Sequence, residues 1–249
     1  MPDQDAIPDL GTIIVTGASR GIGAATAIDL ARRGFTVGCL SRSGRPPERA
    51  AESDAFLCET CDVGDEDQIK RAFASIAERG GGVQGLVNNA GVHTEAASEA
   101  LTAEAFEHVM RINATSVMMA SREVFPYLSE DGGKIVNIGS FFDKLGVPRN
   151  LAYCASKAAV GAITRCLAVE WAAKGIQVIN VAPGYVDTEI TAEFLGNPKA
   201  AAWLNARIPM HRLGTADEVA RLAAALISED IPFLTGETIY IDGGHGMAV

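Results

Sequence analysis

Residues Gly11 to Arg33 read GTIIVT-GASRGIG-AATAIDLARR, and this stretch decides the fold. Its first residues form a short β-branched run of the kind found in buried parallel strands. From Ala24 onward apolar side chains recur at helical spacing, and Gly34 follows as a stop signal. The glycines between them let the backbone bend off the strand and let a phosphate approach the free N–H groups at the helix start. The spacing GxxxGxG differs from the common GxGxxG, but its position between strand and helix predicts dinucleotide binding.

The remainder of the chain continues this alternation of strand and helix. Further strands are expected over 35–40, 55–61, 84–88, 134–138, 176–182 and 238–241. Helices are expected near 48–53 and over 64–80, 102–128, 152–174 and 215–228. The pattern predicts an α/β fold with a doubly wound parallel sheet of about seven strands and helices on both faces. Residues 1–249 are expected to form a single domain, with the mixed segment 188–213 inserted near the C-terminus as a substrate-binding segment.

Composition narrows the range of partners. The chain has 249 residues, of which 48% are hydrophobic, a net charge of −10 and a pI near 4.9. This acidity argues against nucleic acid or an anionic membrane surface as a partner. The first ten residues contain three aspartates and no basic region, so no signal peptide is expected, and no apolar run is long enough to span a bilayer.

The cysteines and histidines predict no metal site. Five cysteines without a framework pattern indicate reduced thiols and a cytoplasmic protein. Cys58 and Cys61 form a lone CxxC, for which packing at the end of a strand is the favoured interpretation. The four histidines are scattered without metal-binding spacing.

A tyrosine and a lysine four residues apart provide a candidate for proton transfer. Tyr153 and Lys157 lie near the start of a predicted helix, where this spacing puts both on one face. A nearby ammonium favours the phenolate and lowers the tyrosine pKa from about 10. Such a tyrosine can exchange a proton with a carbonyl or alcohol oxygen. Ser140, at the end of the preceding strand, could hydrogen-bond the same oxygen.

Taken together, these motifs resemble the short-chain dehydrogenase/reductase family over about residues 10 to 245. The matching pieces are Thr16-Gly-Ala-Ser-Arg-Gly-Ile-Gly23, Asp62-Val63, Asn88-Asn-Ala-Gly91, Asn113, Gly139-Ser140, Tyr153-x-x-x-Lys157 and Pro183-Gly184 with Thr188. The resemblance implies a Rossmann-type fold and an oxidoreductase that moves hydride between a nicotinamide and a carbonyl or secondary alcohol. One departure is Gly139, where many members carry a second serine.

The resemblance also implies roles for individual residues. Tyr153 would be the general acid/base, Ser140 would orient the substrate oxygen, and Lys157 would bind the nicotinamide ribose and lower the tyrosine pKa. Asn113 would hold a water that connects Lys157 to solvent, although a helix-interior asparagine satisfied by backbone is the alternative. The residues implied in cofactor binding are Gly17, Ser19, Arg20, Gly21, Ile22, Gly23, Ser41, Arg42, Asp62, Val63, Asn89, Ala90, Gly91, Tyr153, Lys157, Pro183, Gly184, Val186 and Thr188.

The end of the second strand predicts a preference for NADP(H) over NAD(H). An NAD enzyme of this shape places a carboxylate there, on the ribose 2′-hydroxyl. Here that position is Ser41, followed by Arg42, and Arg20 is a second cation on the same side. A guanidinium pairs well with a phosphate dianion, although both arginines could instead be solvated.

The substrate is left open by the sequence. The motifs resemble 3-oxoacyl-acyl-carrier-protein reductases, and also sugar, polyol and xenobiotic-ketone members. Ser129-Glu130-Asp131 and the net charge disfavour an acidic carrier protein, so a small free ketone or short acyl thioester is expected. The alternative class is a catalytically silent nucleotide-binding sensor or scaffold. Candidate pocket residues, with loop packing as the alternative, are His93, Phe141, Phe142, Asn150, Tyr185, Phe194 and Trp203.

The helix expected over 152–173 is apolar nearly all round, which predicts self-association. A helix against a sheet needs only one apolar stripe. We therefore expect this helix and the 103–128 helix to pair with their copies in a homotetramer or homodimer.

Overall fold

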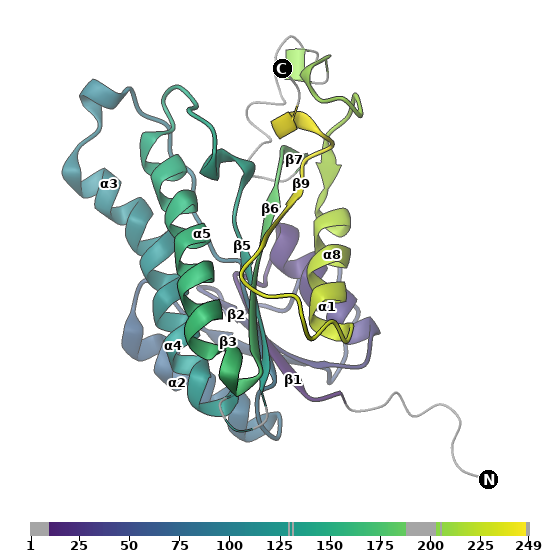
Figure 1. Ribbon diagram of the computed structural model, residues 1–249. Helices are drawn as coiled ribbons and strands as arrows, with labels where there is room; N and C mark the ends of the chain where they lie inside the picture. The colour runs from purple at the N-terminus through teal and green to yellow at the C-terminus, as the bar shows by residue number, and fades with distance from the viewer. Residues whose placement is uncertain (1–9, 129, 131, 188–202, 205, 248–249) are drawn as a thin grey trace.

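A seven-stranded parallel sheet forms the centre of the protein, as seen in a computed structural model (Figure 1). The structure describes residues 10–128, 130, 132–187, 203–204 and 206–247. Along the sheet the strand order is β3-β2-β1-β4-β5-β6-β9. The strands are β1 (Thr12–Thr16), β2 (Thr36–Ser41), β3 (Phe56–Thr60), β4 (Gly85–Asn88), β5 (Gly133–Ile138), β6 (Ile176–Pro183) and β9 (Thr238–Ile241). The predicted single-domain, doubly wound α/β fold is therefore confirmed.

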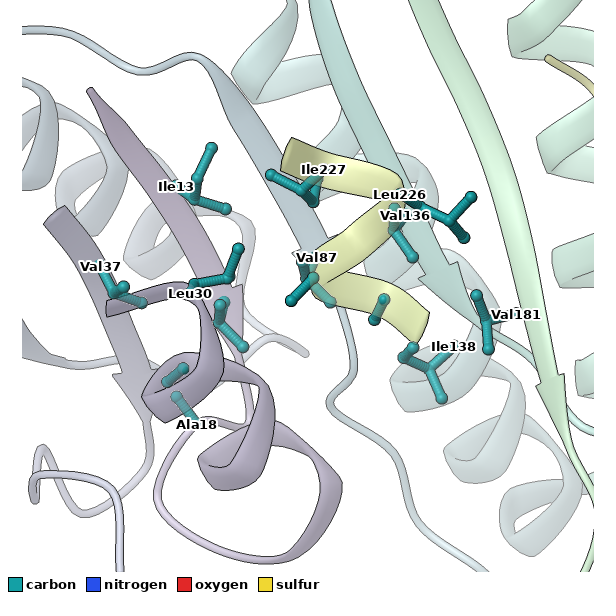
Figure 2. Packing of buried hydrophobic residues seen from close by; sticks show 14 of the residues in the cluster. Ile13, Ala18, Leu30, Val37, Val87, Val136, Ile138, Val181, Leu226 and Ile227 are labelled. Atoms are coloured by element: carbon teal, nitrogen blue, oxygen red, sulfur yellow. The ribbon is translucent and has the colours of Figure 1, made fainter. Parts of the chain in front are cut away.

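Helices cover both faces of this sheet (Figure 1). They are α1 (Gly21–Arg32), α2 (Glu66–Arg79), α3 (Ala103–Met110), α4 (Ser116–Leu128), α5 (Leu151–Trp171) and α8 (Ala216–Ser228). Helices α1 and α8 pack on one face, where Leu30 and Ile227 belong to one buried cluster with Val87 and Val136 of the central strands (Figure 2). Helices α2, α4 and α5 pack on the other, around Phe73, Met119 and Ala168. Fully buried β-branched strand residues explain why the strands read as continuous apolar runs.

The chain reverses direction across the sheet between β1 and β4. From β1 it adds β2 and then β3 on one side, and it returns to place β4 on the other side of β1. The turns that follow β1 and β4 are therefore neighbours at the carboxyl edge of the sheet, which is where ligands bind in folds of this type.

Predicted helix starts are confirmed by their capping bonds. The Asp65 side chain accepts from the N–H groups of Asp67 and Gln68 at the start of α2. Thr102 caps α3, and Thr215 with Glu218 forms a capping box at the start of α8. Each cap satisfies N–H groups that have no partner within the helix.

One expectation for local structure is wrong, and the structure refines another. No helix forms over 48–53, because Pro46 and Pro47 precede the segment and Arg49 adopts a left-handed φ of 65°. The helical run beyond Thr102 contains a π-helical turn at Arg111–Thr115, which separates α3 from α4. A π turn inserts one extra residue into a helix and is frequent at functional sites.

A short second ladder was not predicted. β7 (Val186–Asp187) pairs in parallel with β8 (Gly214–Thr215) beyond the end of β6. Much of the predicted substrate-binding segment 188–213 lies outside the described residues. Among the helices of the described part, none is long and apolar enough to cross a bilayer.

Candidate active site

The glycine-rich turn after β1 forms a cradle in which a side chain would not fit. Gly17 and Gly21 have φ of +66° and +57°, a region that L side chains rarely adopt. A Cβ on Gly23 would collide with the carbonyl oxygen of Gly17, and one on Gly17 would lie 2.9 Å from the Cα of Ala90. The turn brings the start of α1 close to the backbone that follows β4. This geometry fits the phosphates of a dinucleotide.

Asn89 holds the two neighbouring turns together. Its Nδ2 donates to the carbonyl oxygens of Thr16 at 3.0 Å and Gly17 at 3.2 Å. In return, Thr16 Oγ1 accepts from the N–H groups of Asn89 and Ala90. The Asn89 amide therefore contributes by fixing the cradle, a role that the sequence pattern did not indicate.

Glu48 occupies the cradle from the loop after β2, and sequence reasoning missed it. The N–H of Gly21 donates to Glu48 Oε1 at 2.7 Å, and the N–H of Glu48 donates to the carbonyl oxygen of Ser19 at 2.9 Å. Arg49 pairs with Asp217 at 3.2 Å and ties the same loop to α8. A carboxylate thus lies at the positive end of α1, where an anion is stabilised.

The predicted adenine-ribose residues lie at the ends of β2 and β3. Ser41 is buried at the end of β2, and its Oγ lies 3.3 Å from Ser43 Oγ, while the following Arg42 is exposed. Asp62 Oδ1 accepts from the Gly64 N–H at 2.9 Å, and Val63 is buried. Neighbouring parallel strands bring these side chains to the same edge as the glycine turn.

The predicted catalytic residues come together at the ends of β5 and α5. Ser140 lies two residues beyond the end of β5, and Tyr153 and Lys157 lie one turn apart on α5. Lys157 Nζ donates to the carbonyl oxygen of Ile138 at 2.8 Å and lies 5.6 Å from the centre of the Tyr153 ring. The strand end and the helix are thereby fixed to each other around the tyrosine.

The pKa of Tyr153 differs from the expectation that Lys157 lowers it. Burial raises the pKa of Tyr153 to about 12, and the hydrogen bond from Ser140 only partly opposes this effect. Burial also lowers the pKa of Lys157 to about 8. Removal from water dominates the pKa of both groups, so the tyrosine pKa is raised beside Lys157 and not lowered.

Asn113 lies in the π turn and contacts the backbone after β4. Its Oδ1 accepts from the Val92 N–H at 2.8 Å, and its Nδ2 donates to the Val92 carbonyl oxygen and to Ser156 Oγ. A Cβ on Gly91 would lie 3.3 Å from Asn113 Oδ1 and 3.9 Å from Lys157 Nζ. The π turn therefore brings Asn113 against the turn after β4 and close to the lysine.

A buried polar network connects the strands and helices that carry the site, and sequence reasoning missed it. Asn88 Nδ2 donates to Ser121 Oγ and to Asn137 Oδ1, and Asn137 Nδ2 donates to Thr164 Oγ1. The network joins β4 and β5 to α4 and α5. Buried polar groups that are fully hydrogen-bonded specify one arrangement of a core, so this network fixes how α5 lies on the sheet.

The glycine at position 139, where the family pattern often has a second serine, has a structural reason. A Cβ at this position would lie 2.5 Å from Oδ1 and 2.8 Å from Nδ2 of Asn180 on β6. Asn180 thus fills the space that a second serine would need.

The predicted cofactor residues Pro183, Gly184 and Val186 lie at the carboxyl end of β6 and just beyond it. The Gly184 N–H donates to the Ile241 carbonyl oxygen, and Val186 is buried. Thr188 lies outside the described residues.

Most of the candidate pocket residues gather around Tyr153. His93, Phe141, Phe142, Asn150 and Tyr185 form one connected cluster with it. Trp203 instead stacks against Arg207, whose guanidinium carbon is 4.2 Å from the ring centre. Phe194 falls in the part of the chain that the structure does not describe.

The cysteine motif does not form a site. Cys58 pairs in register with Cys39 of β2, and the thiols of these two residues interact. Cys58 packs toward the α1 and α8 face, whereas Cys61 packs toward the opposite one. Among the described residues no group of histidine, cysteine and acidic side chains could hold a metal ion.

Comparisons with known proteins agree with this geometry. A family model described as enoyl-(acyl carrier protein) reductase matches residues 17–246. Glucose 1-dehydrogenase of Gluconobacter oxydans is 38% identical over 240 residues, which cover 93% of this chain and 90% of that protein. The 3-oxoacyl-[acyl-carrier-protein] reductase MabA of Mycobacterium tuberculosis is 34% identical, with 95% and 93% covered. The crystal structure of a gluconate 5-dehydrogenase from Burkholderia cenocepacia in complex with NADP and tartrate matches with a TM-score of 0.89 at 32% identity, covering 97% of each chain.

Proposed function

We propose that this protein is an NADP(H)-dependent ketoreductase. The chain belongs to the short-chain dehydrogenase/reductase family. It is therefore an oxidoreductase of the kind that binds a nicotinamide cofactor. It would transfer hydride between the nicotinamide and a carbonyl or secondary alcohol carbon of a small molecule. The observation that carries the proposal is the placement of Tyr153 one helical turn from Lys157, with Ser140 just beyond the end of β5 and Lys157 close to the turn after β4 that borders the glycine cradle.

We assign proton transfer to Tyr153. Burial keeps its phenol protonated over the physiological range, which suits donation of a proton to a carbonyl oxygen during reduction. The Ser140 hydroxyl hydrogen-bonds the same oxygen and orients it. The cofactor supplies the hydride to the carbonyl carbon when it is bound.

Lys157 and Asn113 position the reacting groups in this proposal. Lys157 is anchored on the Ile138 carbonyl and holds the ribose next to the nicotinamide. In the reverse reaction Tyr153 would accept the alcohol proton as its phenolate, a form that the positive charge of a bound oxidised nicotinamide would favour. Asn113 is fixed by Val92 and connects the lysine to solvent through a water.

The remaining predicted residues would hold the rest of the cofactor. The N–H groups of the glycine turn take the phosphates, and Asp62 and Val63 border the adenine. Asn89 to Gly91 line the ribose side, and Val186 and Thr188 take the carboxamide. Arg42, and Arg20 on the same side, favour the 2′-phosphate of NADP(H), since no carboxylate ends β2.

A sugar or polyol is the second candidate substrate. Similarity to a glucose 1-dehydrogenase and to a gluconate 5-dehydrogenase favours it. The reaction type is the same in both cases, and so is the proposed role of Tyr153.

We further propose one NAD(P)-binding domain in which residues 188–213 contribute to the substrate site. The subunits would assemble as a homotetramer or homodimer through α4 and α5. Val169, Leu151 and Met118 expose 82%, 51% and 39% of their surface on these helices, which supports this interface. Free thiols at the five cysteines suit a reducing cytoplasm.

The test is to follow the absorbance of the reduced nicotinamide with purified protein and a panel of ketones. We expect oxidation of NADPH to depend on the ketone and to exceed that of NADH. Absence of turnover with every carbonyl and both cofactors, despite binding of the nucleotide, would favour a silent nucleotide-binding protein instead.

A further inference from the structure

Aromatic rings border Tyr153 on two sides. The ring of His93 meets it edge-on, with 4.8 Å between ring centres and an interplanar angle of 89°. The ring of Phe142 meets it at 5.9 Å and 85°. Tyr153 and His93 are partly exposed, whereas Phe142 is buried at 8% exposure. A molecule that reaches the Tyr153 hydroxyl therefore passes between two flat rings, of which only that of Phe142 is apolar.

The aromatic wall continues away from the tyrosine. Tyr185 packs edge-on against Phe142 at 5.9 Å and against Phe141 at 5.3 Å. Phe141 and Phe142 belong to a 3₁₀ turn that Ser140 caps, and the Phe142 N–H donates to Ser140 Oγ at 3.3 Å. The same turn thus carries both the serine that contacts the reacting oxygen and the rings that would contact the rest of the substrate.

His93 and Asn150, which adjoin the Tyr153 ring, are already paired with each other, whereas His245, which stacks on Tyr185 at 5.6 Å, keeps a buried Nδ1 without a partner among the described residues. His93 Nε2 lies 2.6 Å from Asn150 Oδ1, and Asn150 Nδ2 donates to the Pro148 carbonyl oxygen at 3.0 Å. Because that amide oxygen only accepts, Nε2 carries the proton and the pair is satisfied. Asn150 is also buried, so its amide is not offered to a ligand.

The charged groups nearest to Tyr185 are paired as well. Glu95, which raises the pKa of Tyr185, is 3.7 Å from Arg149, and Arg207 stacks on Trp203. These side chains are exposed and lie beyond the rings. They could contact the far end of a substrate, but they do not line the path to the Tyr153 hydroxyl in the described part of the site.

This arrangement discriminates between substrate classes. A polyhydroxylated ketone that loses water on binding needs a hydrogen-bond partner for each hydroxyl, and each unpaired group costs about 1–3 kcal/mol. A flat apolar ring has no such requirement and gains contacts with the aromatic rings. Among the described side chains, the rings around Tyr153 offer few polar partners to the many hydroxyls of such a ketone, and a site with few partners rejects polar substrates.

We infer that the preferred substrates are ketones whose carbonyl lies on or next to a flat, apolar ring, either aryl or alicyclic, and not polyhydroxylated sugars. This inference rests on the proposed ketoreductase function and specifies its substrate class. Phe142 and His93 are then the specificity-determining residues, because their rings flank the carbonyl when its oxygen contacts Tyr153 and Ser140.

The test compares kcat/KM for β-tetralone and D-fructose with saturating NADPH. We expect β-tetralone to be preferred by on the order of 100-fold or more. Phe142→Leu, which keeps an apolar side chain but removes the ring, should lower kcat/KM for β-tetralone by roughly two- to tenfold, as expected from the ~0.5–1.5 kcal/mol of an aromatic pair. The same variant should lower kcat/KM for D-fructose by a smaller factor, because a polyhydroxylated chain gains little from contact with the ring. Phe125→Leu is the matched control, because Phe125 packs against Trp171 on the far side of α5.

The possible failures are distinguishable. Preference for D-fructose, or equal losses for both substrates in Phe142→Leu, overturns the inference and leaves the proposed function standing. If no carbonyl is reduced, the proposed function fails. Calorimetric titration of β-tetralone and D-fructose into the NADP⁺-loaded protein then decides the inference alone, which stands only if β-tetralone binds more tightly and loses affinity in Phe142→Leu.

Discussion

Lys157 Nζ donates a hydrogen bond to the carbonyl oxygen of Ile138 at 2.8 Å, and this bond joins α5 to the end of β5. It is made between an ionisable group that is only 5% exposed and the last residue of a central strand. The tyrosine one turn earlier and the serine two residues after Ile138 are thereby held in fixed relation. The bond also compensates only part of the cost of removing the lysine from water, which leads to a pH-dependent stability.

The free energy of unfolding should rise with pH in a window set by Lys157. Its pKa falls to about 8 on folding, from an ordinary value of 10.5. Below pH 8 both states carry the proton, and above it the unfolded chain still binds a proton that the folded chain has lost. The contribution of this lysine to stability therefore increases from pH 8 toward 10.5. We expect cofactor-free wild type to gain stability relative to Lys157→Met across this window, measured by urea unfolding.

The comparison of wild type with Lys157→Met is made below pH 10, because above this pH Tyr153 changes the free energy of unfolding in the opposite direction. Its pKa is raised on folding from 10.0 to about 12, so the unfolded chain loses the phenolic proton first and stability falls. A difference between wild type and Lys157→Met that does not change with pH would contradict the account of the buried ammonium.

Arg42 should determine the preference between the two nicotinamide cofactors. It is exposed directly after Ser41, and a guanidinium there pairs with a 2′-phosphate but has no partner on a 2′-hydroxyl. In fluorescence titrations, Arg42→Ala should raise the dissociation constant for NADPH by roughly tenfold or more and that for NADH by much less. Arg45→Ala, in the same loop, is the control. Equal losses for both cofactors, or a wild-type preference for NADH, would show that the proposal is wrong.

Glu48 should oppose binding of the cofactor. Its carboxylate accepts from the Gly21 N–H at 2.7 Å, in the cradle that we propose for a phosphate. Glu48→Gln removes the negative charge but keeps an acceptor, so both nucleotides should bind more tightly and NADPH should gain more. The gain should shrink as salt is raised, because screening weakens repulsion between exposed charges. Glu52→Gln serves as the control. If Glu48→Gln bound the nucleotides more weakly, the Glu48 carboxylate would instead stabilise the turn.

Val169 should lie in a subunit interface. It exposes 82% of its surface on α5, next to the exposed Glu170. A charge buried in an apolar interface is costly, so Val169→Glu should lower the assembly state, whereas Glu170→Gln should not. Light scattering at micromolar concentrations measures the mass. A monomeric wild type would refute the proposed homotetramer and homodimer.

Much of the fold was predictable because local signals agreed with the global pattern. The strand after Gly11 is a continuous β-branched run, and Asp65, Thr102 and Thr215 cap their helices as their residue types suggest. The meeting of Ser140, Tyr153 and Lys157 was predictable for the same reason, since the spacing of Tyr153 and Lys157 is local and the ends of parallel strands lie on one edge.

What the sequence did not reveal depends on contacts between distant segments. The bond from Gly21 to Glu48 joins the start of α1 to a loop whose local composition suggested a helix. The π turn at Asn113 depends on Val92, and the pairing of Asn137 with Thr164 depends on how α5 lies on the sheet. The raised pKa of Tyr153 follows from burial, which residue spacing alone does not specify.

The most direct test of the central claim is the turnover of Tyr153→Phe on a ketone that the wild-type enzyme reduces with NADPH. The substitution keeps the ring that packs against His93 and Phe142 but removes the transferable proton. We predict that kcat falls by at least ~10²–10⁴, while the dissociation constant for NADPH is unchanged and Tyr127→Phe, on α4, behaves as wild type. Turnover of Tyr153→Phe within about tenfold of wild type would contradict the assignment of Tyr153 as the general acid.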